Sequence, residues 1–383
     1  MKIFHLEFAK IGSGLSGGEK CMLEVIKYLK SREVKNIILT TDNGRKTYED
    51  LGLVEDVFLE YIIITSEWSE KKFYPFISYV IRFFYFTKIK NIILKKVNSN
   101  SDVLICHSDF FPNTLFALFV SKLFKRKFYW FHMLAPDIFK GFEGHFTNKF
   151  HFPSPSVIHY KLNQILFKLA ARQGVVITNS PYYKDLFHEN VYNINKYSGV
   201  KTVDLDSGGK KYDLAFLGRF HAQKGLFEIP KILKILKQYK PDISLVIMGG
   251  GDKKIEKKFL KKITEAGLDE NIDYVGFISS DKKFDYLRQS KVFIFPSYYE
   301  SFGQVALEAM ANGLPVIAYD LPVFSVFEKG MAKVPILDNE KFANEIIKSL
   351  NNLDSLSIEA KEYAMTFSWD KTGEEIYNLI LNK

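Results

Sequence analysis

Residues 296–308 read PSYYESFGQVALE, and this segment is the most informative part of the sequence about the fold. An apolar run, VFIF at residues 292–295, precedes it, and a second run, PVIA at residues 315–318, follows soon after Gly313. The pattern predicts a strand, a loop, a helix and a second strand, which is the repeating unit of a parallel α/β sheet. Ligands of such sheets bind at the carboxyl ends of the strands, so the sequence predicts a binding site at this loop.

The predicted loop and helix combine two carboxylates with free backbone donors. Glu300 and Glu308 stand eight positions apart. The N–H groups of residues 302–304 begin the helix, and such a helix end binds anions, phosphate above all. Gln304 is neutral and adds no charge that would repel an anion. A carboxylate beside a phosphate site accepts hydrogen bonds from sugar hydroxyls.

A second motif stands upstream, where residues 218–225 read GRFHAQKG between an apolar run at 212–217 and a predicted helix. Arg219 and Lys224 are fixed cations of the kind that stabilise the growing charge of a departing diphosphate. The two motifs together resemble those of the retaining glycosyltransferases of family 4, which have a Glu-x7-Glu signature and a G-R-[FL]-x-x-x-K-G motif. The resemblance is strong over roughly residues 212–318 and diffuse before them.

The resemblance implies the GT-B fold, an α/β architecture with two Rossmann-like doubly wound domains that face a central cleft. Residues 1–200 would form the acceptor-binding domain and residues 201–366 the nucleotide-sugar-binding domain, with residues 367–383 forming a terminal helix that crosses back. The implied activity is transfer of a sugar, with retention of configuration, from a UDP- or GDP-linked donor to a glycan or lipid-linked acceptor. It implies a hexosyltransferase in glycan biosynthesis that uses no metal and no cofactor.

The resemblance also assigns roles to residues of the second half. Arg219 and Lys224 would hold the diphosphate, Glu300 the transferred sugar and Glu308 the ribose. Phe277 follows a predicted strand at residues 274–276 and would contact the base. The other donor-binding residues implied there are Gly218, Ser301, Phe302, Gly303 and Val305.

In the first half, the resemblance points to a glycine-rich loop and two histidines. Gly17 and Gly18 would face the donor diphosphate. His132 follows a predicted strand at residues 128–131, where the family has a His beside the donor sugar, and it is assigned a catalytic role. His107 follows a predicted strand at residues 103–106 and is assigned to the acceptor.

The N-terminal loop leaves a second function open. Gly12, Gly14 and Gly17 match the dinucleotide fingerprint G-x-G-x-x-G, and Asp42 stands at the end of the second predicted strand, where an acid would bind ribose. Alone, this pattern would indicate an NAD-dependent oxidoreductase or epimerase. The spacing to the acid is longer than usual, and the motifs of the second half have no role in such an enzyme. A non-catalytic sugar-nucleotide-binding protein is disfavoured because both C-terminal signatures are complete.

Charge and composition narrow the partners and the compartment. The net charge of +9 indicates an anionic partner, and the basic, aromatic segment from Lys71 to Lys88 is a candidate for contact with an anionic membrane surface. No recognition motif for nucleic acid accompanies the charge. The first residues read as a strand instead of a signal peptide, no apolar run is long enough to span a bilayer, and Cys21 and Cys106 lack metal or redox spacing. We therefore expect a cytoplasmic protein, at most peripheral on the membrane.

A metal site is not expected. Asp204-Leu205-Asp206 is a literal D-x-D, the pattern that holds a divalent metal in another glycosyltransferase fold. It lies in a predicted linker at residues 198–211 and not at the end of a strand. Arg219, Lys224 and helix N-termini already offer positive charge to a diphosphate.

Overall fold

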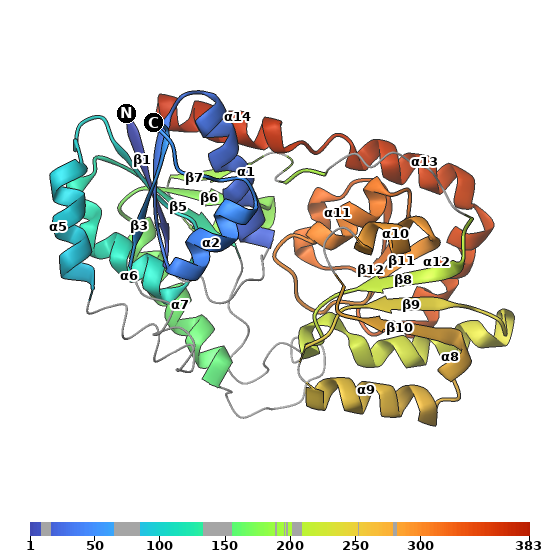
Figure 1. Ribbon diagram of the computed structural model, residues 1–383. Helices are drawn as coiled ribbons and strands as arrows, with labels where there is room; N and C mark the ends of the chain where they lie inside the picture. The colour runs from blue at the N-terminus through green and yellow to red at the C-terminus, as the bar shows by residue number, and fades with distance from the viewer. Residues whose placement is uncertain are drawn as a thin grey trace. The chain divides into compact units, whose positions relative to one another are not determined.

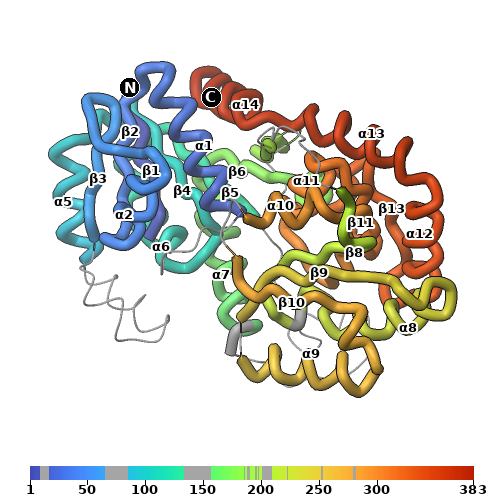
Figure 2. The backbone as a smooth tube through the Cα atoms, turned by 45° about the vertical axis from the view of Figure 1, so that its right-hand side comes forward, coloured from blue at the N-terminus to red at the C-terminus, as the bar shows by residue number. Residues whose placement is uncertain are grey.

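The computed structural model describes residues 1–8, 17–64, 85–132, 155–187, 190–194, 196, 198–200, 209–251, 253–278 and 282–383. They belong to two compact units (Figures 1 and 2). The N-terminal unit comprises the described residues of Met1–Ile138, Ser154–Ser198 and Trp369–Lys383, and the C-terminal unit those of Gly199–Ser368. Several residues of the sequence hypotheses lie outside the described ranges: Gly12, Gly14, Asp204, Asp206 and most of the segment from Lys71 to Lys88.

The N-terminal unit is built on a seven-stranded parallel sheet. In spatial order the strands are β3 (Leu59–Ile63), β2 (Lys35–Thr40), β1 (Lys2–Glu7), β4 (Val103–Cys106), β5 (Arg126–Phe131), β6 (Val175–Thr178) and β7 (Val191–Asn193). Its helices are α1 (Gly17–Ser31), α2 (Asp42–Asp50), α5 (Phe86–Lys96), α6 (Phe111–Val120), α7 (Pro155–Ala171) and α14 (Trp369–Asn382). The chain runs outward from β1 in one direction and then from β4 in the other, so the switch point for ligand binding lies between β1 and β4.

Burial explains why these segments pair. β4 reads VLIC and is buried throughout, and β1 buries all but its first residue, as expected for strands covered by helices on both faces. α14 packs against α1 at a position where only glycine fits: a Cβ at Gly373 would lie 2.4 Å from Cγ of Tyr28. The C-terminal helix therefore belongs to the N-terminal unit, where both views draw it beside α1 (Figures 1 and 2).

The C-terminal unit has a six-stranded parallel sheet. Its strands, in spatial order, are β10 (Ile272–Gly276), β9 (Leu245–Met248), β8 (Tyr212–Leu217), β11 (Ser290–Phe295), β12 (Val316–Tyr319) and β13 (Met331–Val334). Its helices are α8 (Ile229–Tyr239), α9 (Lys253–Glu265), α10 (Lys282–Arg288), α11 (Gln304–Ala311), α12 (Asn339–Asn351) and α13 (Leu353–Ala364). α8 and α9 lie on one face of the sheet, and α10 and α11 on the other (Figure 1). Here the switch point lies between β8 and β11.

The predicted fold class, two Rossmann-like α/β domains, is confirmed. One detail of the dinucleotide hypothesis is wrong: Asp42 does not end a strand but begins α2, where its carboxylate lies 3.4 Å from Nζ of Lys46. A carboxylate at this position is stabilised by the positive end of the helix and by a lysine four residues later. These interactions account for Asp42 without a bound ribose. Among the described residues, no helix has both the length and the apolar character that crossing a membrane requires.

Candidate functional site

In the C-terminal unit, the two sequence motifs form two loops that touch. The peptide N–H of Tyr298 donates to the carbonyl of Gln223 over 2.8 Å. Gly225 has φ +64, and a Cβ there would lie 1.8 Å from the carbonyl oxygen of Pro296. Only glycine allows this approach, both because of its left-handed backbone and because of the space. The loops after β8 and β11 therefore form one structure at the switch point of the sheet.

This contact pairs a predicted diphosphate ligand with a predicted sugar ligand. Nζ of Lys224 lies 2.5 Å from Oε1 of Glu300, and the two side chains are only 16% and 8% exposed. Arg219 is exposed on the same loop. The structure thus brings Lys224 and Glu300 together and leaves Arg219 open to solvent. An anion that binds Lys224 and a hydroxyl that binds Glu300 would both enter at this pair.

The second carboxylate is also paired, with a residue that the sequence did not single out. Oε2 of Glu308 lies 2.5 Å from Nζ of Lys283, with the two side chains 4% and 18% exposed. Lys283 belongs to α10, which follows β10. In a sequence with this many lysines its spacing carries no signal, and only the fold reveals it as a neighbour of Glu308.

Glycine turns after β8 and β9 meet beside Lys224, because a Cβ at Gly218 would lie 3.9 Å from Cδ of Lys224. Gly249, which follows β9, has φ +128, and a Cβ there would lie 2.0 Å from the carbonyl oxygen of Gly218. A Cβ at Gly250 would lie 3.9 Å from Cβ of Phe277, whose side chain is 88% exposed at the end of β10. The sequence predicted Gly218 and Phe277 but missed this glycine loop. Three consecutive glycines, 249–251, directly after a predicted strand were the available signal.

The start of α11 places a helix N-terminus at the same edge. Gly303 has φ +101, and a Cβ there would lie 3.0 Å from the ring of Phe324. Phe302 packs inward, with its ring centroid 5.3 Å from that of Phe327. Its side chain therefore belongs to the core, and only its backbone amide is available for the predicted donor contact. Ser301 and Val305, which flank this turn, are half-buried.

In the N-terminal unit, the structure brings three predicted residues to one place. His132 follows β5, and Gly17 and Gly18 begin α1. A Cβ at Gly18 would lie 2.9 Å from Cε1 of His132, so the absence of a side chain makes room for the imidazole. Nε2 of His132 donates to the carbonyl of His107 over 2.7 Å, which fixes the ring and leaves its Nδ1 as an acceptor when the ring is neutral.

His107 lies in a buried polar row across the switch point. Its Nε2 is 2.7 Å from Nδ1 of His5, and Nε2 of His5 is 2.9 Å from Oδ1 of Asn36. Because Nδ2 of Asn36 donates to the carbonyl of Val34, its Oδ1 must accept from His5, and His5 in turn accepts from His107. Burial lowers the pKa of His5 to about 4 and holds the pKa of His107 well below its usual range. His107 is only 3% exposed, and its predicted contact with an acceptor stays a prediction.

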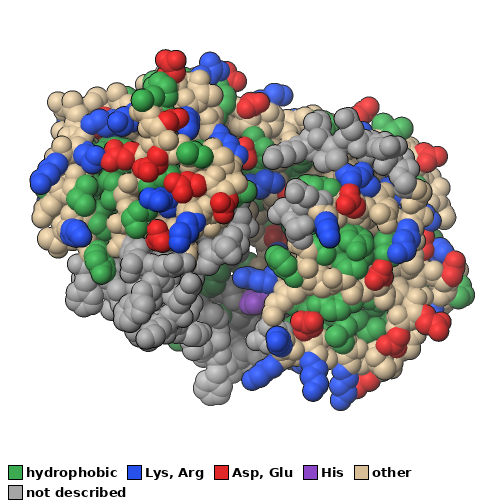
Figure 3. Space-filling view, in the orientation of Figure 1, with side chains coloured by type: hydrophobic (Ala, Val, Ile, Leu, Met, Phe, Trp, Pro, Cys, Tyr) green, Lys and Arg blue, Asp and Glu red, His purple; other side chains and the backbone are tan. Residues whose placement is uncertain are grey.

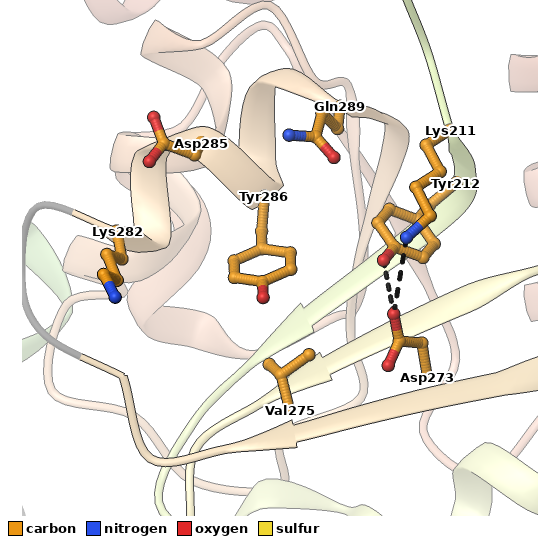
Figure 4. Close-up of a pocket in the computed structure, with 8 residues that line it drawn as sticks. All are labelled: Lys211, Tyr212, Asp273, Val275, Lys282, Asp285, Tyr286 and Gln289. Carbon is orange, nitrogen blue, oxygen red and sulfur yellow. Dashed lines mark hydrogen bonds and ion pairs between the residues drawn. The ribbon is translucent and has the colours of Figure 1, made fainter.

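A separate pocket of about 420 Å³ lies between α10 and the strands β8 and β10 (Figure 4). It contains none of the residues that the sequence predicted. Its lining residues are Lys211, Tyr212, Asp273, Val275, Lys282, Asp285, Tyr286 and Gln289. Across the ranges that the structure describes, no three His, Cys, Asp or Glu side chains gather as a metal site would need.

Comparison with known sequences bears on the C-terminal unit. Residues 201–364 match the family model described as Glycosyl transferases group 1. A D-inositol 3-phosphate glycosyltransferase of Arthrobacter sp. (strain FB24) is 38% identical over 112 residues, which are 28% of this chain and 26% of that protein. A phosphatidyl-myo-inositol mannosyltransferase of Propionibacterium freudenreichii subsp. shermanii is 24% identical over 249 residues, 60% of this chain and 62% of that protein. Both matches span less than two thirds of the relative's own length.

Comparison with solved structures bears on the whole chain. A sucrose-phosphate synthase from Thermosynechococcus elongatus superposes with a TM-score of 0.76 at 18% identity, covering 100% of this chain and 98% of that one. Anabaena HepE, solved in complex with UDP and glucose, has a TM-score of 0.73 at 16% identity and full coverage of both chains. At such identities the likeness shows the fold. The chain therefore has the GT-B fold, and its residues 201–364 are similar to the glycosyl transferases group 1 family.

Proposed function

We propose that this protein is a retaining glycosyltransferase of family 4 that moves a hexose from a UDP- or GDP-linked donor to a glycan or lipid-linked acceptor. One observation carries the proposal most directly. Two carboxylates, Glu300 and Glu308, are each bound by a lysine at the carboxyl ends of the strands in the unit that matches the family. Paired carboxylates and cations at such an edge suit a ligand that combines hydroxyls with a diphosphate.

The proposed reaction is a substitution on one face of the sugar. The bond between the anomeric carbon and the phosphate oxygen breaks, and its electron pair goes to the diphosphate, whose charge Arg219 and Lys224 stabilise. The acceptor oxygen bonds to the anomeric carbon from the same face and gives its proton to the departing phosphate oxygen. Glu300 orients the sugar hydroxyls, Glu308 binds the ribose, and His132 acts at the donor sugar. The amides of Phe302 and Gly303 complete the sugar site.

The proposal also covers the acceptor, the membrane contact and the absence of a cofactor or metal. His107 is assigned to the acceptor domain, and the relatives named for phosphatidyl-myo-inositol and inositol phosphate make a glycan or lipid-linked acceptor reasonable. The segment from Lys71 to Lys88 is proposed to contact an anionic membrane surface from the cytoplasmic side. No cofactor and no metal ion take part, because Arg219, Lys224 and the N-terminus of α11 provide the positive charge.

Binding and turnover test the proposal. Differential scanning calorimetry with UDP, GDP, ADP and NAD should show stabilisation by UDP or GDP and none by NAD; a ligand at about 100-fold its dissociation constant adds about 2.7 kcal/mol. Release of the nucleoside diphosphate from UDP- or GDP-linked hexoses should continue in excess EDTA. Stabilisation by NAD alone would support the oxidoreductase alternative. Binding of UDP or GDP without turnover on any acceptor would support the non-catalytic one.

A further inference from the structure

We propose that Lys283 reads the base of the donor nucleotide and selects uracil or guanine over adenine. The inference rests on the proposed function, because it takes Glu308 as the residue that binds the ribose. It extends that function to a residue outside both sequence motifs. Lys283 lies on α10, whereas the diphosphate cations Arg219 and Lys224 lie on the loop after β8.

The pair that Lys283 forms is more buried than a surface ion pair. Glu308 is 4% exposed, Lys283 is 18% exposed, and their charged atoms lie 2.5 Å apart. Taking two charges out of water costs several kcal/mol per ion, so a buried pair is seldom kept for stability alone. A function at a ligand site gives a reason for retaining it.

The ammonium group of Lys283 has donors to spare. A lysine has three N–H donors and no acceptor, and among the described residues Lys283 donates to Glu308. The same Nζ lies 4.9 Å from the ring centroid of Phe284, which occupies one further side. The rest of the ammonium group is partly open to solvent and can donate to an acceptor atom of a ligand.

The position of Lys283 places it at the nucleoside end of the site. Ribose hydroxyls bound to Glu308 lie beside Lys283, and the sugar carbon next to the 2′-hydroxyl carries the base. Phe277 is exposed at the end of β10, the strand that precedes α10 in the chain, and its aromatic ring is available to a base. The ammonium group of Lys283 is therefore placed to contact the edge of the base and not the diphosphate.

The chemistry of the bases then sets the preference. Guanine presents an O6 acceptor, and uracil, like thymine, presents an O4 acceptor, whereas adenine presents an N6 amino donor at the matching position. An ammonium group attracts the two keto oxygens and repels the amino group. A hydrogen bond to a charged group contributes about 1.5–3 kcal/mol, which is at least about tenfold in affinity.

The neighbouring lysine provides a matched control. Lys282 is one residue away on the same helix, but it lines the separate pocket between α10 and the sheet, where Figure 4 shows its side chain. The change Lys282→Met removes the same charge from α10 without touching Glu308. Comparing changes at Lys282 and Lys283 therefore separates the long-range effect of losing a positive charge from the loss of the proposed contact with the base.

Isothermal titration calorimetry with UDP, GDP and ADP tests the proposal. The unchanged protein should bind UDP or GDP at least about tenfold more tightly than ADP. Lys283→Met should reduce that ratio to about one, Lys283→Arg should retain most of it, and Lys282→Met should leave it unchanged. A ratio that Lys283→Met leaves intact, or an equal loss for all three nucleotides, would overturn the base-reading role.

A second pair of variants covers the case in which Lys283→Met leaves Glu308 with an unpaired buried charge and unfolds the protein. The ratio of UDP or GDP to ADP is measured in Glu308→Gln and in Glu308→Gln with Lys283→Gln. We expect the first variant to keep the preference at weaker affinity and the second to lose it; equal ratios would contradict the proposal. If the unchanged protein binds no nucleoside diphosphate, the proposed function fails first, which distinguishes the two failures.

Discussion

At the scale of single residues, the site depends on two lysines that hold two carboxylates. Lys224 and Lys283 each lie 2.5 Å from a glutamate, but they come from different elements, and we propose that they contact different parts of a donor. Lys224 lies where a diphosphate would leave and Lys283 where a nucleoside would lie. The residue-scale predictions therefore concern which part of the donor each side chain contacts.

Lys224→Ala should lower kcat by about 10²–10³, the range for removing one preorganised contact to the transition state. The physical reason is that the departing diphosphate loses a cation in a site where Lys224 is only 16% exposed. Steady-state kinetics with a confirmed donor measure the effect. Lys234→Ala, at an exposed position of α8, should leave kcat unchanged, and a similar value for both variants would contradict the assignment.

The two carboxylates should separate in a binding experiment. Glu308→Gln is expected to weaken the affinity for free UDP or GDP, because its proposed partner is the ribose. Glu300→Gln is expected to spare that affinity and to lower turnover, because its proposed partner is the transferred sugar. Calorimetry with the free nucleotide and kinetics with the complete donor give the two readouts. Equal weakening of nucleotide binding by both changes would show that the division of roles is wrong.

At the scale of elements, the loops after β8 and β11 act as one structure. Tyr298 ties them together twice: its N–H donates to Gln223, and its hydroxyl donates to Glu228 over 2.9 Å. Burial alone would raise the pKa of Glu228, but hydrogen bonds from Lys231, Asn339 and Tyr298 outweigh it and lower the pKa. An ionised, fully bonded Glu228 thus anchors the loop that carries Glu300.

Gly225→Ala tests how far the site depends on this contact. The substitution combines a left-handed backbone with a Cβ 1.8 Å from the carbonyl oxygen of Pro296, so the two loops must move apart. We expect a clear fall in Tm and a loss of turnover. Gly267→Ala is the matched control, because Gly267 has φ +65 but nothing within 4 Å of its Cβ. It should show only the backbone cost of about 1–2 kcal/mol; equal effects of the two changes would contradict the role of the loop contact.

At the scale of the whole molecule, each unit has its own sheet and its own switch point. The three tryptophans, Trp68, Trp130 and Trp369, all fall within the sequence ranges of the N-terminal unit. Tryptophan emission therefore reports on the unfolding of that unit. It can be used to measure how the buried histidines of the unit make its stability depend on pH.

The N-terminal unit should lose stability as the pH falls from 6.5 to 4. His5 has a folded pKa of about 4 against about 6.5 when unfolded, so the unfolded state binds more protons in this window and is favoured by acid. The shift corresponds to about 3 kcal/mol. Urea unfolding followed by tryptophan emission at several pH values measures it. His5→Gln should weaken the dependence, and the part that remains is expected from His107, whose pKa burial also lowers. His221→Gln, in the other unit, should not change it; an unchanged slope in His5→Gln would contradict this account.

Net charge gives a second prediction at this scale. Lys and Arg side chains gather along the lower edge of the C-terminal unit in Figure 3, where α9 lies in Figure 1. α9 has six lysines, all exposed: Lys253, Lys254, Lys257, Lys258, Lys261 and Lys262. A test of membrane binding must therefore distinguish binding through the segment from Lys71 to Lys88 from the general attraction of a positively charged protein to an anionic membrane.

The purified protein should float with anionic liposomes and not with neutral ones, and less so as salt screens charges beyond about 8–10 Å. Changing Lys71, Lys72, Arg82 and Lys88 to Gln should abolish flotation, at about 1 kcal/mol per charge near the surface. Changing Lys253, Lys254, Lys257 and Lys258 to Gln removes the same charge from α9 and should leave flotation largely intact. Equal losses would mean that net charge alone attracts the membrane.

Local patterns in the sequence were enough to predict the parallel α/β class, most of the strands and the members of two motifs. Strand β8 (Tyr212–Leu217) and helix α14 (Trp369–Asn382) were recognisable because apolar periodicity and glycine positions are local properties of a chain. β3, β7 and β13 were not predicted; β7 (VYN) and β13 (MAKV) are too short to show a pattern, whereas β3 (LEYII) is apolar and was missed. Which charged side chains pair with each other became visible in the folded chain alone. Lys283 and Glu308 are 25 residues apart, and His5 and His107 are 102 apart. Such pairs form because strand order brings distant strand ends to one edge of a sheet, and no local pattern in the sequence specifies that order.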